Sequence, residues 1–306
     1  MKLLLVFTLL LSSIYAETSL AETPLKVSKV ADNIYAIEGE LNQRSKENHA
    51  NNATFGLVVT NEGALLIDSG GSYIGAKQIA NTIKTITDKP VKVVINTGGQ
   101  DHRWWGNGYF KSLGTHIITS KATYDDQKKR ASDQYNSIER FLGDDFKGTK
   151  DVYADERFEN SLDLTLGQYT FKIVHAGAAH TVGDSFVWMP KERVMFTGDI
   201  VFMDRLLGPG PAADTASWMK VFETMASYKP TVIIPGHGAP GSLKKATEET
   251  YNYIKFMRTE VGKILDNDGS MLDAKKIDQS HYSYLKVFNK MAGRSAGSFF
   301  RQMEFE

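Results

Sequence analysis

Short apolar runs of strand length alternate with segments of helical periodicity along the chain, and this alternation limits the fold more than any other feature. Phe55–Thr60 and Ala64–Asp68 flank the polar turn Asn61–Gly63, a pattern typical of a β-hairpin. A helical pattern at Ile74–Ile86 then precedes the β-branched run Val91–Ile95. We therefore expect an α/β (α+β) fold in which helices cover two packed sheets.

The same alternation continues to about residue 265. Further expected strands are His116–Thr119, Tyr169–Val174, Ser185–Met189, Arg193–Phe196 and Thr231–Ile234. Further expected helices are Lys121–Leu142, Ala216–Tyr228 and Leu243–Leu265. No linker rich in Pro or Ser separates the two halves, so we expect one domain over 22–241 and a C-terminal helical extension of it over 242–306.

The balanced net charge of the chain excludes a partner that is attracted by long-range electrostatics. Thirty-six Lys and Arg residues balance 36 Asp and Glu residues, so the chain has no general attraction for nucleic acid or an anionic membrane. We expect a small-molecule substrate and no nucleic-acid partner. The absence of cysteine excludes disulfides, thiolate catalysis and Cys-rich zinc modules.

The N-terminal sequence has the pattern of a secretory signal peptide. Lys2 precedes the apolar run Leu3–Leu11, and the small residues Ala16 and Ala21, which suit a signal-peptidase cleavage site, follow it. We expect residues 1–21 to be a signal peptide that is cleaved after Ala16 or Ala21. The mature protein is then expected to be periplasmic or secreted and not inserted in a membrane.

Candidate chemistry gathers where four expected strands end. Each strand leads into a loop that contains Gly together with His or Asp; these loops are 96–107, 178–184, 197–199 and 235–238. Small residues let the backbones approach a shared centre. Imidazole and carboxylate groups suit zinc, iron or manganese without a thiol.

The ordered set of motifs resembles the metallo-β-lactamase-fold metallohydrolase superfamily over roughly Val27–Gly241. The matching blocks are Leu66–Gly70, Asn96–Asn107, Ala179–Asp184, Phe196–Asp199 and Ile234–Gly238. This resemblance implies an αββα sandwich of two mixed sheets with the active site along one edge. It also implies a small ester-, lactone- or lactam-like substrate.

The first metal-binding motif of this chain is degenerate. The family motif reads N-T-H-x-H-x-D-H-x-x-G-N, and its two ends align here without a gap. That alignment places Gly98 and Gln100 at two His positions, His102 at the Asp position and Arg103 at the last His position. Glycine has no ligand atom, and a protonated guanidinium has no lone pair to donate.

An alignment that slips by one residue treats Asp101 and His102 as the D-H pair of the motif. With Asp199 and His237 they form one half-site, and His180 remains alone in the other. The gapless alignment instead places Arg103 within hydrogen-bond reach of Asp199, and there Gly98→His with Arg103→His is expected to raise zinc affinity. Both alignments predict at most one tightly bound zinc ion.

The resemblance implies roles for nine residues. The expected metal ligands are Asp101, His102, His180, Asp199 and His237. Asp101 and Asp199 are also the expected catalytic residues, which orient a water or pass a proton. We expect Gln100, Arg103 and Trp104 to contact the substrate, and Asp68 to support the metal loop by hydrogen bonds.

Two functions remain open from the sequence. The first is an exported hydrolase that uses a metal-activated water at an incomplete, mononuclear site. The alternative is a non-catalytic periplasmic binding protein on the same fold that has lost its metal. The metal content of the purified protein discriminates between them.

Overall fold

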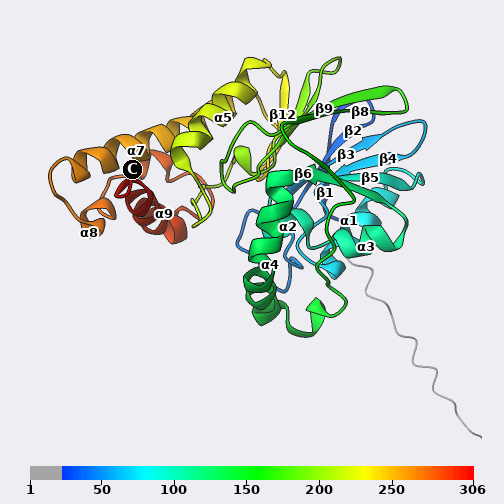
Figure 1. Cartoon of the computed structure of the whole chain (residues 1–306), viewed down its shortest axis with the longest axis horizontal. Helices are drawn as coiled ribbons and strands as arrows, with labels where there is room; N and C mark the ends of the chain where they lie inside the picture. Colours follow the sequence, from blue (N-terminus) through cyan, green and yellow to red (C-terminus); the bar gives the residue numbers. More distant parts are fainter. Residues whose placement is uncertain (1–22) are drawn as a thin grey trace, which may run out of the picture.

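Two mixed β-sheets pack face to face within residues 23–306, the part of the chain that the computed structural model describes (Figure 1). The expected signal peptide lies outside the described residues. The first sheet has the strand order β1-β2-β3-β4-β5-β6-β7. Its strands are β1 (Lys26–Ala31), β2 (Ile34–Glu38), β3 (Thr54–Val59), β4 (Ala64–Ile67), β5 (Val91–Asn96), β6 (His116–Ser120) and β7 (Glu156–Phe158).

The second sheet has the order β12-β11-β10-β9-β8. Its strands are β8 (Ser161–Leu166), β9 (Tyr169–Val174), β10 (Phe186–Met189), β11 (Val194–Phe196) and β12 (Val232–Ile234). Strands β11 and β12 are parallel, and the other neighbours in this sheet are antiparallel. In the first sheet the pairing changes from antiparallel to parallel between β4 and β5.

Local sequence explains the change from antiparallel to parallel pairing. The predicted hairpin over 55–68 forms, with Val59 opposite Ala64. The predicted helix follows as α1 (Tyr73–Lys84), where the Ser72 hydroxyl caps the first turn by accepting from the Gly75 backbone N–H. Because α1 carries the chain back along the sheet, β5 enters parallel to β4.

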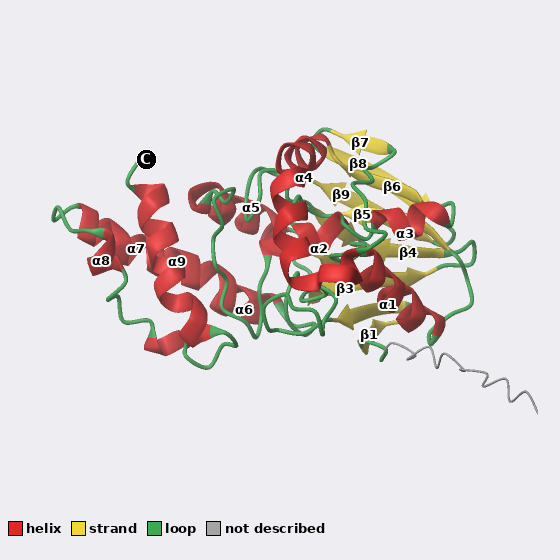
Figure 2. Ribbon diagram, turned by 90° about the horizontal axis from the view of Figure 1, so that it is seen from below, coloured by secondary structure: helices red, strands yellow, loops and turns green. Residues whose placement is uncertain are grey.

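Apolar side chains fill three layers and produce the predicted αββα order. Residues from both sheets, among them Ile67, Ile95 and Phe196, form the cluster between the sheets. Helices α1, α2 (Asp101–Trp104), α3 (Asn107–Ser112) and α4 (Lys121–Leu142) lie outside the first sheet (Figure 2). Helix α5 (Thr215–Ser227) and the C-terminal helices pack outside the second sheet.

The predicted helix over 243–265 is interrupted. It consists of α6 (Leu243–Ala246), a wide π-helical turn at Thr247–Tyr251 and α7 (Asn252–Leu265). Helices α8 (Met271–Ala274) and α9 (Phe288–Met303) complete a lobe beside the sandwich (Figure 1). Short 3-10 turns lie at Gly143–Phe146, Gly198–Ile200 and Ser280–Tyr282. The lobe shares one apolar cluster with β10 and β11.

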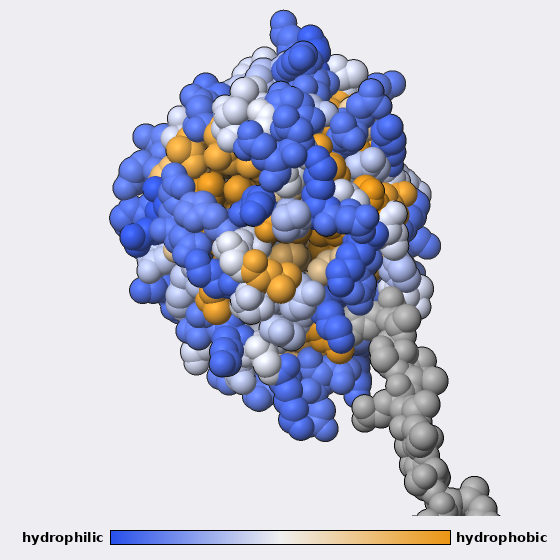
Figure 3. All heavy atoms as spheres, turned by 90° about the vertical axis from the view of Figure 1, so that its right-hand side faces the viewer, coloured by the Kyte–Doolittle hydropathy of each residue, from blue (hydrophilic) through white to orange (hydrophobic). Residues whose placement is uncertain are grey.

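The end of the sandwich remote from this lobe is mostly hydrophilic, with hydrophobic atoms exposed in several separate groups (Figure 3). Within residues 23–306, no helix combines the length and the apolar character needed to cross a bilayer.

Candidate metal centre

Three loops at one end of the two sheets deliver the candidate ligands. His102 lies on the short helix α2 after β5, and Asp199 lies on the turn Gly198–Ile200 after β11. His237 follows β12, and its backbone pairs with that of Phe202. The carboxyl ends of β5, β11 and β12 therefore meet at one site, as the motif positions predicted.

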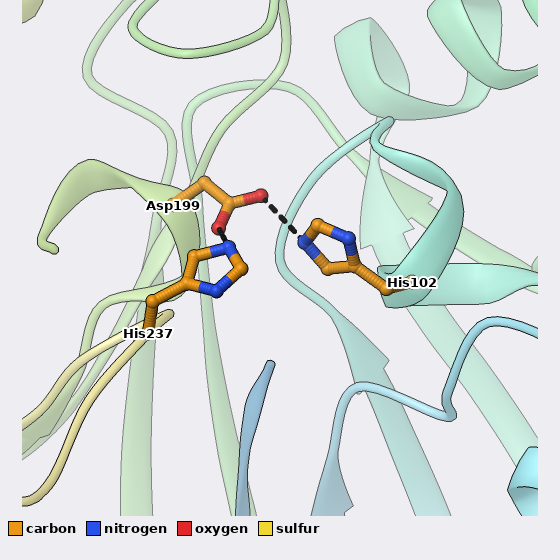
Figure 4. A group of neighbouring side chains, drawn as sticks. All are labelled: His102, Asp199 and His237. Carbon is orange, nitrogen blue, oxygen red and sulfur yellow. Dashed lines mark hydrogen bonds and ion pairs between the residues drawn. The ribbon is translucent and has the colours of Figure 1, made fainter. Parts of the chain in front are cut away.

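His102, Asp199 and His237 form a buried cluster (Figure 4). His102 Nε2 lies 3.1 Å from Asp199 Oδ2, and His237 Nε2 lies 3.2 Å from Asp199 Oδ1. One nitrogen or oxygen atom from each of the three side chains lies within 4.8 Å of the other two. Imidazole nitrogen and carboxylate oxygen are ordinary zinc ligands, so this cluster is a candidate metal site.

Arg103 lies directly beneath this cluster and is fully buried. Its Nη2 and Nε donate to Asp199 Oδ1 and Oδ2 at 2.5 and 3.2 Å. Its Nη1 donates to Asp68 Oδ2 at 2.9 Å and to the Thr54 carbonyl at 3.1 Å, and Nη2 also reaches the Gly236 carbonyl at 2.8 Å. This is the arrangement of the gapless alignment and not of the slipped one.

The buried ion pair fixes the ionisation of Asp199. Burial disfavours the charged carboxylate, but the positive charge of Arg103 outweighs this effect and holds the pKa of Asp199 well below its usual range. Burial, together with the charge of Arg205, holds the pKa of His237 well below its usual value. The cluster therefore contains an ionised carboxylate beside a neutral imidazole at neutral pH.

Asp101 lies behind His102 and outside the three-residue cluster. Its Oδ1 accepts from Arg44 Nη1 at 2.5 Å and lies 3.2 Å from His102 Nδ1. Burial opposes ionisation of Asp101, but the charge of Arg44 overrides it and lowers the pKa of the carboxyl. The structure thus places Asp101 where it orients the His102 ring, and not among the ligand atoms.

His180 also stays outside the cluster. Its ring lies against Phe202 and Trp218, with centroid separations of 5.4 and 5.5 Å, and its Nδ1 is buried without a hydrogen-bond partner. Burial lowers the pKa of His180 to about 4. His180 is therefore a neutral side chain beside the candidate site with one unused ring nitrogen.

Carboxylates occupy the space beside Gly98 and Gly99 in the first metal loop. A Cβ built on Gly98 would collide with Asp184 Oδ1, and one built on Gly99 would collide with Asp126 Oδ2. Asp184 is fixed because its Oδ2 accepts from the Thr181 backbone N–H at 2.7 Å. Burial, followed by the charge of Asp199, raises the pKa of Asp184 to about 7. A histidine at 98 does not fit beside Asp184 in this position, contrary to the expectation that Gly98→His restores a ligand.

A pocket with a volume of about 220 Å³ opens over the cluster. Gln100 lines it, so this expected substrate contact lies at the pocket. Its lining also includes residues that no sequence motif marked: Gln43, Arg44, Asn52, Arg130, Phe202, Arg205, Met291 and Arg294. The Gly208–Pro211 loop forms part of the mouth.

Arg103 and Trp104 do not reach this pocket, which corrects two expected substrate contacts. The donors of Arg103 are directed to Asp199, Asp68 and backbone carbonyls. Trp104 is fully buried in an apolar cluster, where it stacks on Tyr153 and its Nε1 donates to Gln134 Oε1 at 3.0 Å. Trp104 and Trp105 therefore belong to the core, because both are buried in the apolar cluster that also contains Ile138 and Leu142 of α4.

Asp68 supports the metal loop as expected. Its Oδ1 accepts from the Thr97 backbone N–H at 2.7 Å, and its Oδ2 accepts from the Thr97 hydroxyl at 2.8 Å. The structure adds the ion pair with Arg103 to this role.

The model of the metallo-beta-lactamase superfamily matches residues 51–237. A "Metallo-beta-lactamase type 2" of Elizabethkingia meningoseptica is 30% identical over 181 residues, which are 59% of this chain and 64% of that protein. The chain thus spans less than two thirds of this relative. "Metallo-beta-lactamase IND-1" of Chryseobacterium indologenes is 27% identical over 184 residues, 59% of this chain and 69% of that protein.

A solved structure of a metallo-beta-lactamase from Pontibacter korlensis has the same fold. It aligns with a TM-score of 0.60 at 23% identity and covers 76% of this chain and 99% of that chain. This likeness confirms the predicted fold class of two mixed sheets with helices outside.

Replacing the buried cation tests its structural role. Arg103→Met leaves the carboxylates of Asp199 and Asp68 buried without their countercharge, so we expect a loss of about 3–5 kcal/mol in the free energy of unfolding. Urea unfolding followed by circular dichroism measures it. Arg140→Met, on the exposed face of α4, is the matched control and should change stability by less than about 0.5 kcal/mol. A loss below about 1 kcal/mol for Arg103→Met would contradict the proposed role.

The close approach of Asp184 to Gly98 predicts a clash that a second substitution relieves. Gly98→Ala should destabilise the fold by about 1–3 kcal/mol, because its methyl group overlaps the fixed Asp184 carboxylate. In the background Asp184→Ala the same change should cost less, which a double-mutant cycle of urea midpoints measures. Gly108→Ala in α3, where a Cβ would make an ordinary 3.5 Å contact with Val152, is the control. Additive costs would exclude the clash.

Proposed function

We propose a hydrolytic function on the premise that this chain belongs to the metallo-beta-lactamase superfamily, as its sequence blocks predicted. In this proposal the protein hydrolyses a small ester-, lactone- or lactam-like molecule. It uses one divalent metal ion, most simply zinc. The family supports a metallo-beta-lactamase-like hydrolase. The substrate class and the single ion are our proposal. The observation that carries it is the His102, Asp199 and His237 cluster beside the pocket.

The chemistry of these donors fits a catalytic metal ion. Two nitrogens and one carboxylate oxygen leave a coordination position open for a water or a substrate. Carboxylates flank both ring nitrogens of His102, since Asp101 Oδ1 lies 3.2 Å from Nδ1 and Asp199 Oδ2 lies 3.1 Å from Nε2. An ion at the cluster would take the Nε2 lone pair and leave the ring proton on Nδ1, where Asp101 would accept it. One contact would have to change: His237 Nδ1 faces Arg205 Nη1 at 3.0 Å, and an ion held at Nε2 would put the ring hydrogen on Nδ1, so that Arg205 would have to turn away from it.

A divalent ion held by His102, Asp199 and His237 would supply an activated water and would polarise the substrate oxygen. The residues of the chain prepare the site for it. Asp199 stays ionised because Arg103 holds it by two donors. Gln100, which lines the pocket, presents a side-chain amide that can hydrogen-bond a substrate over the cluster.

Metal analysis of protein purified without chelator tests this proposal. We expect about one equivalent of metal per chain and loss of nearly all of it in His237→Ala, which removes one of three ligands. His281→Ala is the matched control, because this exposed imidazole contacts Tyr282 and lies outside the cluster. Circular dichroism verifies the fold of each variant. Two equivalents in the native protein, or unchanged metal in His237→Ala, would contradict the single site.

We also propose export, supported by the Lys2 and Leu3–Leu11 pattern. Cleavage after Ala16 or Ala21 predicts a mature protein that begins at Glu17 or Glu22. Mass spectrometry of the protein from the periplasm or the culture medium determines this terminus. Soluble cytoplasmic protein that retains Met1 would refute the proposal.

A further inference from the structure

Four arginines from separate segments line the pocket over the candidate metal site: Arg44, Arg130, Arg205 and Arg294. The lining includes no Asp or Glu. Two of these arginines already have a carboxylate partner, because Arg44 pairs with Asp101 and Arg130 pairs with Asp126. Within residues 23–306, Arg205 and Arg294 have no acidic partner within salt-bridge distance. The pocket therefore presents two guanidinium groups without a carboxylate partner, a buried one on Arg205 and a solvent-exposed one on Arg294.

Arg205 is the more unusual of the two because only 6% of it is exposed. Its Nη1 faces the neutral imidazole of His237 at 3.0 Å, and its Nε is buried with no hydrogen-bond partner. A buried cation without a countercharge is destabilising, so a ligand that supplies the charge gains a strong interaction. The segment around Arg205 is fixed, since the Leu206 backbone N–H donates to the Lys286 carbonyl at 3.1 Å.

Arg294 lines the same pocket although it lies near the C-terminal end of the sequence. It lies on α9, outside the 51–237 region that matches the family. Met291, one turn earlier on the same helix, also lines the pocket and contacts Gln43 through its sulfur. The C-terminal lobe therefore supplies part of the pocket wall, and with it the second free guanidinium.

We propose that Arg205 and Arg294 bind a phosphoryl group of the substrate, so that the hydrolase acts on a small phosphorylated molecule. This deepens the proposed function and rests on it for the reaction, though not for binding. The planar donors of guanidinium match phosphate oxygens. A phosphoryl dianion neutralises both unpaired charges, whereas a monocarboxylate leaves one of them unmatched. A volume of about 220 Å³ restricts the ligand to a small molecule.

Calorimetric titration with inorganic phosphate at pH 8 tests the proposal, with acetate at matched ionic strength as the comparison. The full mature chain is titrated both after chelator dialysis and after metal loading. We expect saturable phosphate binding to both forms, at least about tenfold tighter than acetate. Arg205→Gln and Arg294→Gln should each weaken phosphate binding by about tenfold or more. Arg301→Gln, on the same helix but outside this pocket, should leave it unchanged.

Thermal unfolding separates a binding role from a structural one. Arg205→Gln removes a buried unpaired cation, so its melting temperature should equal or exceed that of the native protein. A lower melting temperature with unchanged phosphate affinity would make Arg205 structural and overturn the proposal. An affinity for acetate equal to that for phosphate would also overturn the proposal. Phosphate binding that requires metal and is unchanged in Arg294→Gln would overturn it as well. A chain that lacks metal yet binds phosphate through both arginines would refute only the proposed hydrolase.

Discussion

The buried ion pair between Arg103 and Asp199 holds the candidate site together. Arg103 comes from the loop after β5 in the first sheet, and Asp199 from the turn after β11 in the second. The same guanidinium bonds Asp68 and the carbonyls of Thr54 and Gly236. One side chain thus joins segments of both sheets at the edge where their strands end. Because it is fully buried, its geometry constrains every loop that it contacts.

This ion pair also shapes the chemistry of the centre. Asp199 is ionised and its two oxygens are oriented, so His102 and His237 meet a fixed negative group. Of the two positions where the family motif has histidine, Gly98 faces the Asp184 carboxylate and Gln100 lines the pocket, so neither supplies an imidazole. We propose one ion and not two because three donors gather at His102, Asp199 and His237 and these two positions add no imidazole.

The sequence predicted eight of the twelve strands in the described part of the chain and the meeting of the loops, since both follow from local patterns, but it did not predict β1, β2, β7 and β8. Strand β9 and helix α4 have the predicted bounds, and the strand-end loops do converge. Trp104 was misplaced because its burial depends on packing against Phe146 and Tyr153, which lie about 40 to 50 positions later in the sequence. The choice between the two alignments also needed tertiary structure, because only the position of Arg103 separates them.

The pocket wall could not be predicted, since its arginines are brought together from positions 44, 130, 205 and 294. Single arginines in a chain of balanced charge give no local signal. What distinguishes Arg205 and Arg294 is the absence of a carboxylate partner within residues 23–306, which only the folded structure reveals. The helical lobe after residue 242 therefore has a role beyond covering the second sheet. It places α9 at the pocket and adds Met291 and Arg294 to the wall, and in our proposal this added charge is what selects the ligand.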